Sequence, residues 1–189
     1  MTDNSLFLII VANPCNKWVN TIKTLVYEQK KFTLEELAAA MNANFGKGAV
    51  GKTGEMFRQL FEGCTAVVVA DLNTYKAAGA EAYESLKAAG IPTMEPFIFE
   101  DSDLYAEWSF LMRLENHLKS CDAVAVAVGS GVINDLAKLA SEHLGRRYII
   151  VGTAASMDGY TAYGASITFE GNKQTFDCKA PMGVIIDPE

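Results

Sequence analysis

Short runs of consecutive apolar residues alternate with stretches of helical spacing along most of this chain. The runs are rich in Val and Ile and cover residues 66–70, 97–99, 123–128, 148–151 and 184–186. Because neighbouring positions are apolar, both faces of each strand are expected to be buried, as in the inner strands of a parallel sheet. The alternation predicts an α/β fold, a parallel sheet flanked by helices on both faces.

Three helices are expected between these strands, at residues 74–89, 101–119 and 132–144. Gly90 and Pro92 close the first, because glycine suits a helix C-cap and proline cannot continue a helix. The second begins with a cluster of potential N-caps. The second and third each place apolar side chains on one helical face: Leu104, Trp108, Leu111 and Leu118 in the second, and Ile133, Leu136, Ala140 and Leu144 in the third.

Two shorter features complete the pattern. A helix at residues 33–41 is expected from Thr33 as N-cap, with Glu36 completing a capping box. Near the C-terminus, residues 167–169 and 174–176 flank the sequence Glu170-Gly171-Asn172, which predicts a small hairpin.

Composition narrows the classes of function. The chain has 189 residues, of which 50% are hydrophobic, enough for one well-filled core. The balance of 16 Lys and Arg against 23 Asp and Glu gives a formal charge of −7, which repels nucleic-acid backbones and anionic lipids. Since no local basic patch offsets this charge, neither a nucleic acid nor a membrane is expected as a partner.

The cysteines and the N-terminal residues indicate the compartment. Cys15, Cys64, Cys121 and Cys178 are far apart and form no CxxC pair, which argues against a zinc knuckle or a disulfide framework. The apolar run at residues 6–12 is short and follows no Lys or Arg, unlike a signal peptide. No run approaches the roughly 18 apolar residues of a membrane span. We therefore expect a cytoplasmic protein.

The sharpest local signal lies where the strand at 123–128 leads into the helix at 132–144. The connecting residues are Gly129, Ser130, Gly131, Val132 and Ile133. Glycines in such a turn let backbone N–H groups approach a pyrophosphate, and the helix N-terminus adds partial positive charge. Asn134 stands where the usual dinucleotide fingerprint has its third glycine. The alternative is a plain glycine-rich turn without a ligand.

A second candidate loop follows the next strand, where residues 153–160 read Thr-Ala-Ala-Ser-Met-Asp-Gly-Tyr. Ligands of open parallel sheets bind beyond the carboxyl ends of the strands. Asp158 could accept hydrogen bonds from substrate hydroxyls there, or could be a turn residue before Gly159. Asp71 ends the strand at 66–70 and could contact an adenosine ribose or base, or cap the helix that follows.

One motif favours another class of protein. Residues 46–53 read Gly-Lys-Gly-Ala-Val-Gly-Lys-Thr and match the phosphate-binding loop of P-loop nucleotide hydrolases, with Asp71 as a potential magnesium ligand. Such a loop should follow a buried apolar strand, whereas residues 38–45 offer only Met41 and Phe45 as large apolar side chains. A P-loop nucleotide hydrolase is kept as an alternative function.

Side chains for catalysis or metal binding are scarce. His117 and His143 are the only histidines and lie on different predicted helices without a ligand-spaced partner, which is typical of packing or surface residues. No Ser-His-Asp or Cys-His set can be assembled. We therefore assign no catalytic residue and no metal ligand.

Taken together, five segments in order resemble the sn-glycerol-1-phosphate dehydrogenases, a branch of the iron-type polyol dehydrogenases related in fold to dehydroquinate synthase. The segments are residues 45–49, 69–75, 129–131 with 134–135 and 137–138, 153–160, and 180–181 with 184–187. Five motifs in order are more specific than any one of them. In the family the first segment is a strand leading into a helix. By this resemblance, the glycines and lysines of residues 46–53 belong to that connection and not to a phosphate-binding loop.

The resemblance implies a Rossmann-like dinucleotide-binding domain at residues 41–189, with a small hairpin near its C-terminus and an extension of unassigned role at 1–40. It also implies roles for matching positions. Asp71 would bind the adenosine end of NAD or NADP, residues 129–133 the pyrophosphate, Thr153 and Ser156 the cofactor near its nicotinamide half, and Asp158 the substrate hydroxyls. Val132 and Ala162 depart from the family, which often has Thr, Lys or Arg at the first position and serine at the second.

The implied reaction is hydride exchange between NAD(P)H and dihydroxyacetone phosphate, giving glycerol 1-phosphate for phospholipid metabolism. In the family a divalent metal (zinc, nickel or iron) polarises the carbonyl and is held by one Asp and two His of a second, helical domain. This chain ends at Glu189 without those ligands, so the truncated polypeptide is expected to be inactive alone. The expected partner is a small phosphorylated polyol or ketone. A homo-oligomer is also compatible with the sequence. The non-enzyme alternative is an inactive stand-alone NAD-binding module.

Overall fold

The computed structural model describes residues 42–154, 157 and 159–187. The helix expected at 33–41 lies outside these residues, and so do Ser156 and Asp158 of the second candidate loop.

Six parallel strands form the central sheet, in the order β1-β8-β5-β4-β2-β3. Their bounds are β1 Ala43–Phe45, β2 Thr65–Asp71, β3 Phe97–Phe99, β4 Ala123–Gly129, β5 Tyr148–Gly152 and β8 Gly183–Ile186. All five strands predicted from the apolar runs are present, with small shifts at some ends. β1 is the additional strand that the family resemblance implied near Phe45. The Rossmann-like parallel sheet is confirmed.

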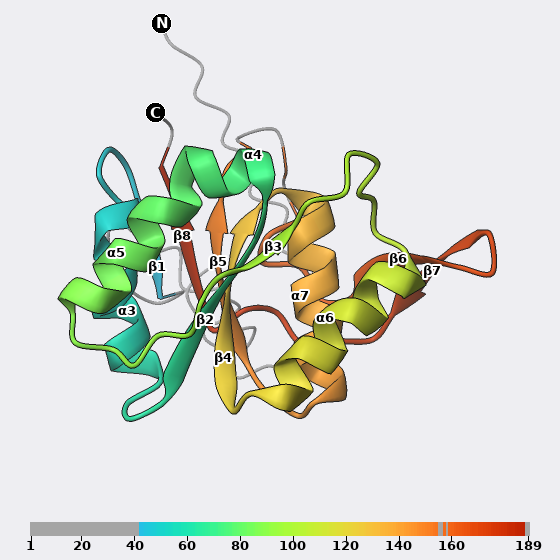
Figure 1. Ribbon diagram of the computed structural model, residues 1–189. Coiled ribbons are helices and arrows are strands. Elements are labelled where there is room, and N and C mark those ends of the chain that lie inside the picture. Colours follow the sequence, from blue (N-terminus) through green and yellow to red (C-terminus); the bar gives the residue numbers. More distant parts are fainter. Residues whose placement is uncertain (1–41, 155–156, 158, 188–189) are drawn as a thin grey trace, which may run out of the picture. The chain divides into compact units, whose positions relative to one another are not determined.

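Helices cover both faces of this sheet (Figure 1). α3 (Thr53–Leu60) and α5 (Ala80–Ala88) lie on one face, and α6 (Trp108–Ser120) and α7 (Gly131–His143) lie on the other. Three short helical segments join these elements: a 3-10 turn, η1 (Val50–Lys52), leads into α3, while α4 (Leu72–Thr74) and a π-helical turn, η2 (Tyr75–Gly79), lead from β2 into α5. Both faces of the strands are covered, as their consecutive apolar residues predicted.

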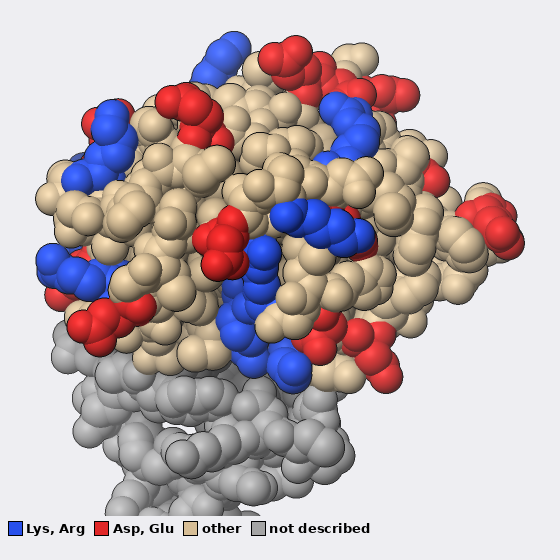
Figure 2. All heavy atoms as spheres, turned by 60° about the horizontal axis from the view of Figure 1, so that its bottom comes forward, with Lys and Arg blue, Asp and Glu red and all other residues tan. Residues whose placement is uncertain are grey.

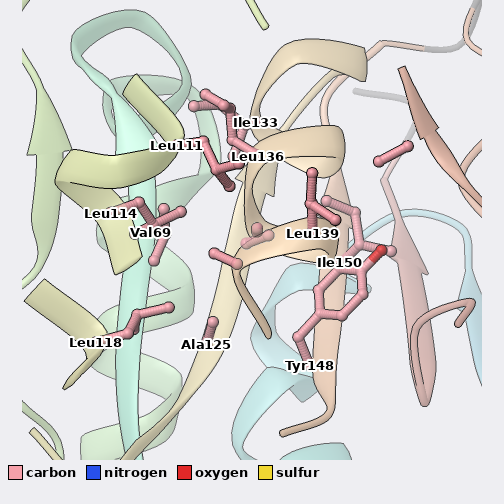
Figure 3. Packing of buried hydrophobic residues seen from close by; sticks show 14 of the residues in the cluster. Val69, Leu111, Leu114, Leu118, Ala125, Ile133, Leu136, Leu139, Tyr148 and Ile150 are labelled. Atoms are coloured by element: carbon pink, nitrogen blue, oxygen red, sulfur yellow. The ribbon is translucent and has the colours of Figure 1, made fainter. Parts of the chain in front are cut away.

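Each inner strand sends alternate side chains into two separate cores. Val69 of β2 belongs to the core under α6 and α7, and Val68 belongs to the core under α3 and α5. Figure 3 shows the first core, in which leucines of α6 and α7 point toward side chains of β2, β4 and β5. Burying a leucine side chain stabilises a fold by about 1.5–3 kcal/mol, so the leucine stripe of each helix is what holds it to the sheet.

The start of α6 differs from the prediction. The helix expected from residue 101 begins at Trp108, because the Glu107 carboxylate caps it and accepts a backbone N–H of the first turn at 2.8 Å. Asp101 instead pairs with Arg113, with 2.8 Å between Nη1 and Oδ2. Leu104 lies before the helix and packs against the core from a loop. Several side chains near the predicted start can cap a helix. Tertiary contacts decide which of them does so.

The helix expected at 74–89 is present and begins earlier, at Leu72. Within its π turn, Gly79 packs against the ring of Tyr75, where an added Cβ would lie 2.7 Å from a ring carbon. Gly90 follows the helix with φ of +73°, a left-handed conformation that favours glycine, which confirms its predicted role as C-cap. The helix expected at 132–144 is α7, shifted by one residue.

A separate two-stranded antiparallel sheet, β6 (Ala165–Phe169) and β7 (Asn172–Phe176), is the predicted hairpin. Its turn contains Glu170 and Gly171, with φ of +51° and +76°, the signs that a type I′ turn requires. Asn172, which was expected in the turn, pairs with Phe169 as the first residue of β7.

Charged side chains of both signs share the surface. Figure 2 shows a face on which Lys and Arg groups lie beside Asp and Glu groups. Among the described residues, Arg113 pairs with Asp101, and Lys179 pairs with Glu142 with Nζ 3.3 Å from Oε1. None of the helices in the described ranges is both long enough and apolar enough to cross a membrane.

Candidate functional site

The glycine-rich turn after β4 leaves the N-terminus of α7 open. Ser130 is its N-cap, and the serine side chain makes no capping hydrogen bond. The first intrahelical bond runs from the N–H of Asn134 to the carbonyl of Ser130, at 3.0 Å. The N–H groups of residues 131–133 therefore have no acceptor within the described part of the chain. Such groups, together with the helix dipole, form an anion site.

The two glycines of this turn are required for different reasons. A Cβ at Gly129 would lie 2.6 Å from Cβ of Ile133, so the strand end and the first turn of α7 could not approach each other. Of the described residues, a Cβ at Gly131 would meet only Met157, with Cε at 3.8 Å, which leaves room for a ligand atom there. Gly129 thus permits the packing of α7, and Gly131 leaves space beside the free N–H groups.

The second candidate loop lies directly beside the first. β4 and β5 are neighbours, with Gly129 paired to Gly152, and the N–H of Thr153 donates to the carbonyl of Gly129 at 3.1 Å. This confirms that the loops after the two strands meet at one edge of the sheet. Thr153 is placed at the start of this loop, whereas Ser156 and Asp158 lie outside the described residues.

Tyr160 connects the two loops, a role that the sequence pattern did not reveal. Its hydroxyl accepts the N–H of Ala154 at 3.1 Å and has two carbonyls within donating distance, that of Ala154 at 3.1 Å and that of Gly129 at 3.3 Å. Its ring covers Gly152, where a Cβ would lie 2.7 Å from the ring. Burial raises the pKa of the Tyr160 hydroxyl, so this hydroxyl stays protonated and able to donate.

Asn134, in the place of the third fingerprint glycine, is fully buried. Its Oδ1 accepts a hydrogen bond from the Tyr148 hydroxyl at 2.9 Å, while its Nδ2 has no partner within the described residues. Asn134 therefore uses Tyr148 of β5 as its partner. With Asn134 in this place, the N–H groups of residues 131–133 still have no acceptor among the described residues.

Asp71 is the N-cap of the helical segment after β2. Its Oδ1 accepts the N–H groups of Asn73 and Thr74 at 2.8 and 2.9 Å, and the Thr74 hydroxyl accepts the N–H of Asp71 at 3.0 Å. The capping alternative is thus confirmed. Both backbone N–H groups bind Oδ1, so Oδ2 has no partner in the described segments, and β2 ends at the same edge of the sheet as β4. Contact with adenosine stays a prediction.

A cavity of about 310 Å³ opens beside the start of α7. It is lined by Gly131, Val132 and Asp135 of α7, by Ser166, Thr168 and Lys173 of the hairpin, and by Tyr105 and Ala106. This volume lies at the small end of the range for ligand pockets. The hairpin residues were missed from sequence because β6 and β7 are far from the glycine turn along the chain.

The cavity lining carries both signs of charge, from Asp135 and Lys173. Burial raises the pKa of the Asp135 carboxyl, while the nearby charges of Lys138 and Lys173 and the N–H of Ser166 oppose this shift. The same N–H donates to Oδ2 of Asp135 at 3.3 Å. Val132, which departs from the family pattern, adds an apolar side chain to the same wall.

The turn that resembles a phosphate-binding loop uses its groups nearest to α3 in contacts within the protein. The hydroxyl of Thr53, which would hold magnesium, is buried and donates to the carbonyl of Val50 at 2.6 Å. The N–H of Gly54 is bound by the Ser85 hydroxyl oxygen at 3.0 Å. β8, β5 and β4 separate β1 from β2, so Asp71 ends a strand far from this turn across the sheet. This geometry disfavours the nucleotide-hydrolase alternative.

The two histidines contact side chains of neighbouring elements. His117 stacks on Phe97, with ring centroids 4.7 Å apart, and burial lowers the pKa of its imidazole. Nδ1 of His143 contacts the buried carboxylate of Glu115 between α7 and α6. Across the described ranges, no group of three or more His, Cys, Asp or Glu side chains could hold a metal ion.

Comparison with known proteins gives a family and close relatives. The model of a family described as iron-containing alcohol dehydrogenase matches residues 44–189. The glycerol-1-phosphate dehydrogenase (NAD(P)+) of Halalkalibacterium halodurans is 36% identical over 122 residues, which are 64% of this chain and 31% of the relative. The enzyme of the same name from Methanothermobacter thermautotrophicus is 35% identical over 147 residues, covering 76% of this chain and 40% of that protein.

Solved structures share the fold. An iron-containing alcohol dehydrogenase from Thermotoga maritima superposes with a TM-score of 0.68 at 19% identity, covering 78% of this chain and 46% of the other. A probable glycerol dehydrogenase from Sinorhizobium meliloti gives 0.63 at 20% identity, covering 76% and 38%. The chain thus spans less than half the length of each of these proteins.

Proposed function

Because this chain belongs to the iron-containing alcohol dehydrogenase family, we propose that residues 41–189 are the dinucleotide-binding domain of a glycerol-1-phosphate dehydrogenase. The complete reaction would exchange hydride between NAD(P)H and dihydroxyacetone phosphate. Relatives that carry this enzyme name are 36% and 35% identical to the chain. The observation that carries the proposal is the open N-terminus of α7, whose first N–H groups face the carboxyl edge of two central strands beside a cavity.

The chain's own residues fit a dinucleotide. The N–H groups of residues 131–133 would bind the pyrophosphate, and Gly131 leaves it the space. Asp71, at the end of the neighbouring strand β2, would bind the adenosine end. Thr153 and Ser156 would contact the cofactor near the nicotinamide, and Asp158 would accept hydrogen bonds from substrate hydroxyls. When bound, the cofactor supplies or accepts the hydride.

The residues described do not fit a catalytic metal. No group of three metal-binding side chains occurs among them, and the two histidines contact Phe97 and Glu115. A catalytic zinc-type site needs about three protein ligands. We therefore assign no step to a metal in this chain, and we expect the 189-residue polypeptide to bind NAD(P) weakly without measurable turnover.

Nuclear magnetic resonance titration of the 15N-labelled chain tests the binding step. NADH is expected to shift the amide signals of residues 129–133 and 153–154 with a Kd on the order of 0.1–1 mM, and ATP is expected to bind more weakly. Saturable ATP binding at residues 46–53, with no response to NADH, would instead support the P-loop alternative.

Turnover separates a dehydrogenase part from a stand-alone binding module. Dihydroxyacetone phosphate reduction should be absent for the chain alone, with zinc, nickel or iron added, and should appear when a relative's helical domain is fused after Glu189. If the fusion binds metal and NADH yet stays inactive, the non-enzyme module is the better description. Turnover by the chain alone would contradict the expectation of inactivity.

A further inference from the structure

Lys138 is a positively charged residue that is buried on the α7 side of the sheet. It lies on α7, is only 1% exposed, and is among the largest fully buried side chains of the described residues. Burial lowers the pKa of its ammonium group, while the nearby charge of Asp135 opposes this shift. Placing an ammonium group in a core is costly unless its donors are satisfied, so an apolar side chain of this size would suit packing alone better.

The donors of Lys138 are used for one particular segment. Its Nζ donates to the carbonyl of Ala162 at 2.8 Å and to the carbonyl of Gly164 at 3.1 Å. These carbonyls belong to the stretch that joins the second candidate loop to β6. A hydrogen bond from a charged donor is stronger than one between neutral groups, so Lys138 holds this backbone firmly against α7.

The same segment is held at both of its ends. At one end, the Tyr160 hydroxyl binds Ala154 and Gly129. At the other end, the N–H of Ser166 donates to Asp135 of α7 at 3.3 Å. Between these two points, before β6 begins at Ala165, Lys138 binds the carbonyls of residues 162 and 164, and the N–H of Gly164 donates to the carbonyl of Cys178 at 2.8 Å. The helix that would hold the pyrophosphate therefore also sets the position of residues 160–166.

We propose that Lys138 is a positioning residue that sets how far the segment at 160–166 stands from the N-terminus of α7, and thereby where the nicotinamide half of the cofactor rests. The proposal depends on the proposed function, because it assumes that the pyrophosphate binds at residues 129–133. Lys138 would not affect binding of the adenosine half, because that half of the cofactor would extend toward β2 and Asp71.

ADP-ribose provides the discriminating probe. It contains the adenosine, the pyrophosphate and a ribose of NADH and lacks the nicotinamide ring. The ratio of its Kd to that of NADH therefore reports the contribution of the nicotinamide ring. Nuclear magnetic resonance titration of the 189-residue chain measures both constants in the weak range and shows which amides respond.

The wild-type chain is expected to bind NADH about fivefold or more tightly than ADP-ribose, the value of roughly one hydrogen bond. In Lys138→Met this preference should fall to about one, while the affinity for ADP-ribose stays within about twofold. Lys138→Arg keeps the charge and the donors and should keep part of the preference. Lys179→Met is the matched control, because Lys179 is 61% exposed and pairs with Glu142 on the surface, and it should change neither constant.

The outcomes distinguish a failure of the proposed function from a failure of the inference about Lys138. If the wild-type chain binds neither ligand, the proposed function fails. If it binds both equally, or if Lys138→Met weakens both equally, Lys138 has a general structural role and the inference is overturned. Should Lys138→Met not fold, the same ratio in Lys138→Arg decides: an unchanged preference overturns the inference, and a reduced one with intact ADP-ribose binding supports it.

Discussion

Two glycine-rich turns in this fold lead from a strand into a helix, and the structure uses them in opposite ways. Residues 46–53 follow β1 at the edge of the sheet, and residues 129–133 follow β4 in its middle. The first matches a phosphate-binding motif letter for letter, whereas the second lacks a fingerprint glycine. Yet among the described residues, the N–H groups of residues 52–54 at the first turn have protein acceptors, whereas those of residues 131–133 at the second have none.

The two turns differ because different elements pack against them. At the first, the 3-10 turn η1 uses the N–H groups of Lys52 and Thr53, and α5 supplies the Ser85 hydroxyl to the N–H of Gly54. α5 approaches so closely that a Cβ at Gly54 would collide with the Ser85 carbonyl. No helix of the described ranges covers Gly131, where an added Cβ would meet Met157 alone among the described residues. A glycine before a helix can thus serve helix packing or ligand approach, and the neighbouring element decides which.

Gly131→Val tests the open turn and has the largest expected effect. The branched side chain fits the protein but occupies the space proposed for the pyrophosphate, so NADH affinity should fall about 100-fold, with little change in thermal stability. Titration calorimetry or NMR measures the affinity. Lys52→Ala, in the other turn, is the matched control and should leave NADH binding intact. Undiminished binding by Gly131→Val would remove the pyrophosphate from this turn.

Gly54→Ala tests the covered turn. Because its new methyl group collides with α5, the free energy of unfolding should decrease by about 2–3 kcal/mol, since overpacking a core is destabilising. Urea unfolding followed by circular dichroism gives the value. Gly51→Ala is the control, since its Cβ would meet only Glu81 at an ordinary 3.5 Å. Equal stability of the two variants would mean that α5 does not close this turn.

Tyr160→Phe sharpens the link between the open turn and its neighbouring loop. The ring that covers Gly152 is kept, and only the hydroxyl that binds Ala154 and Gly129 is lost. Losing hydrogen bonds of this kind should cost about 1 kcal/mol of stability and weaken NADH binding a few-fold. Chemical denaturation and titration of the same sample measure both. A variant as stable as the wild type with unchanged affinity would show that the two loops hold their positions without Tyr160.

Asp71→Asn has the smallest expected effect and concerns the far end of the cofactor. Asparagine can still cap the helix after β2, so stability should change by less than about 0.5 kcal/mol. If Asp71 faces the ribose as proposed, removing its charge should improve NADPH binding relative to NADH by a few-fold. Competition titrations give the ratio. Asp71→Ala should by contrast lose about 1 kcal/mol of stability with the cap, and an unchanged NADPH to NADH ratio in both variants would place Asp71 outside the cofactor site.

Much of the architecture could be predicted from local patterns. The apolar runs at 66–70 and 123–128 became inner strands because consecutive Val and Ala residues are stable only where both sheet faces are covered. Gly90 ended its helix, and Glu170 with Gly171 made the hairpin turn, since both features depend on backbone conformations of single residues. The predicted start of α6 was wrong because Glu107 caps the helix directly before Trp108, while Asp101 pairs with Arg113.

The sequence by itself determined the parallel α/β layering, the glycine turn after β4 and its neighbouring loop, because these follow from the period of apolar residues and from the direction of parallel strands. Tertiary structure alone decided that the turn at 46–53 is closed by Ser85, that Tyr160 and Lys138 fasten the segment after residue 159, and that Lys173 of the hairpin joins the cavity wall. Each of these contacts joins elements that are distant along the chain. No local spacing rule describes them, because a side chain's partner depends on which elements the sheet order brings together.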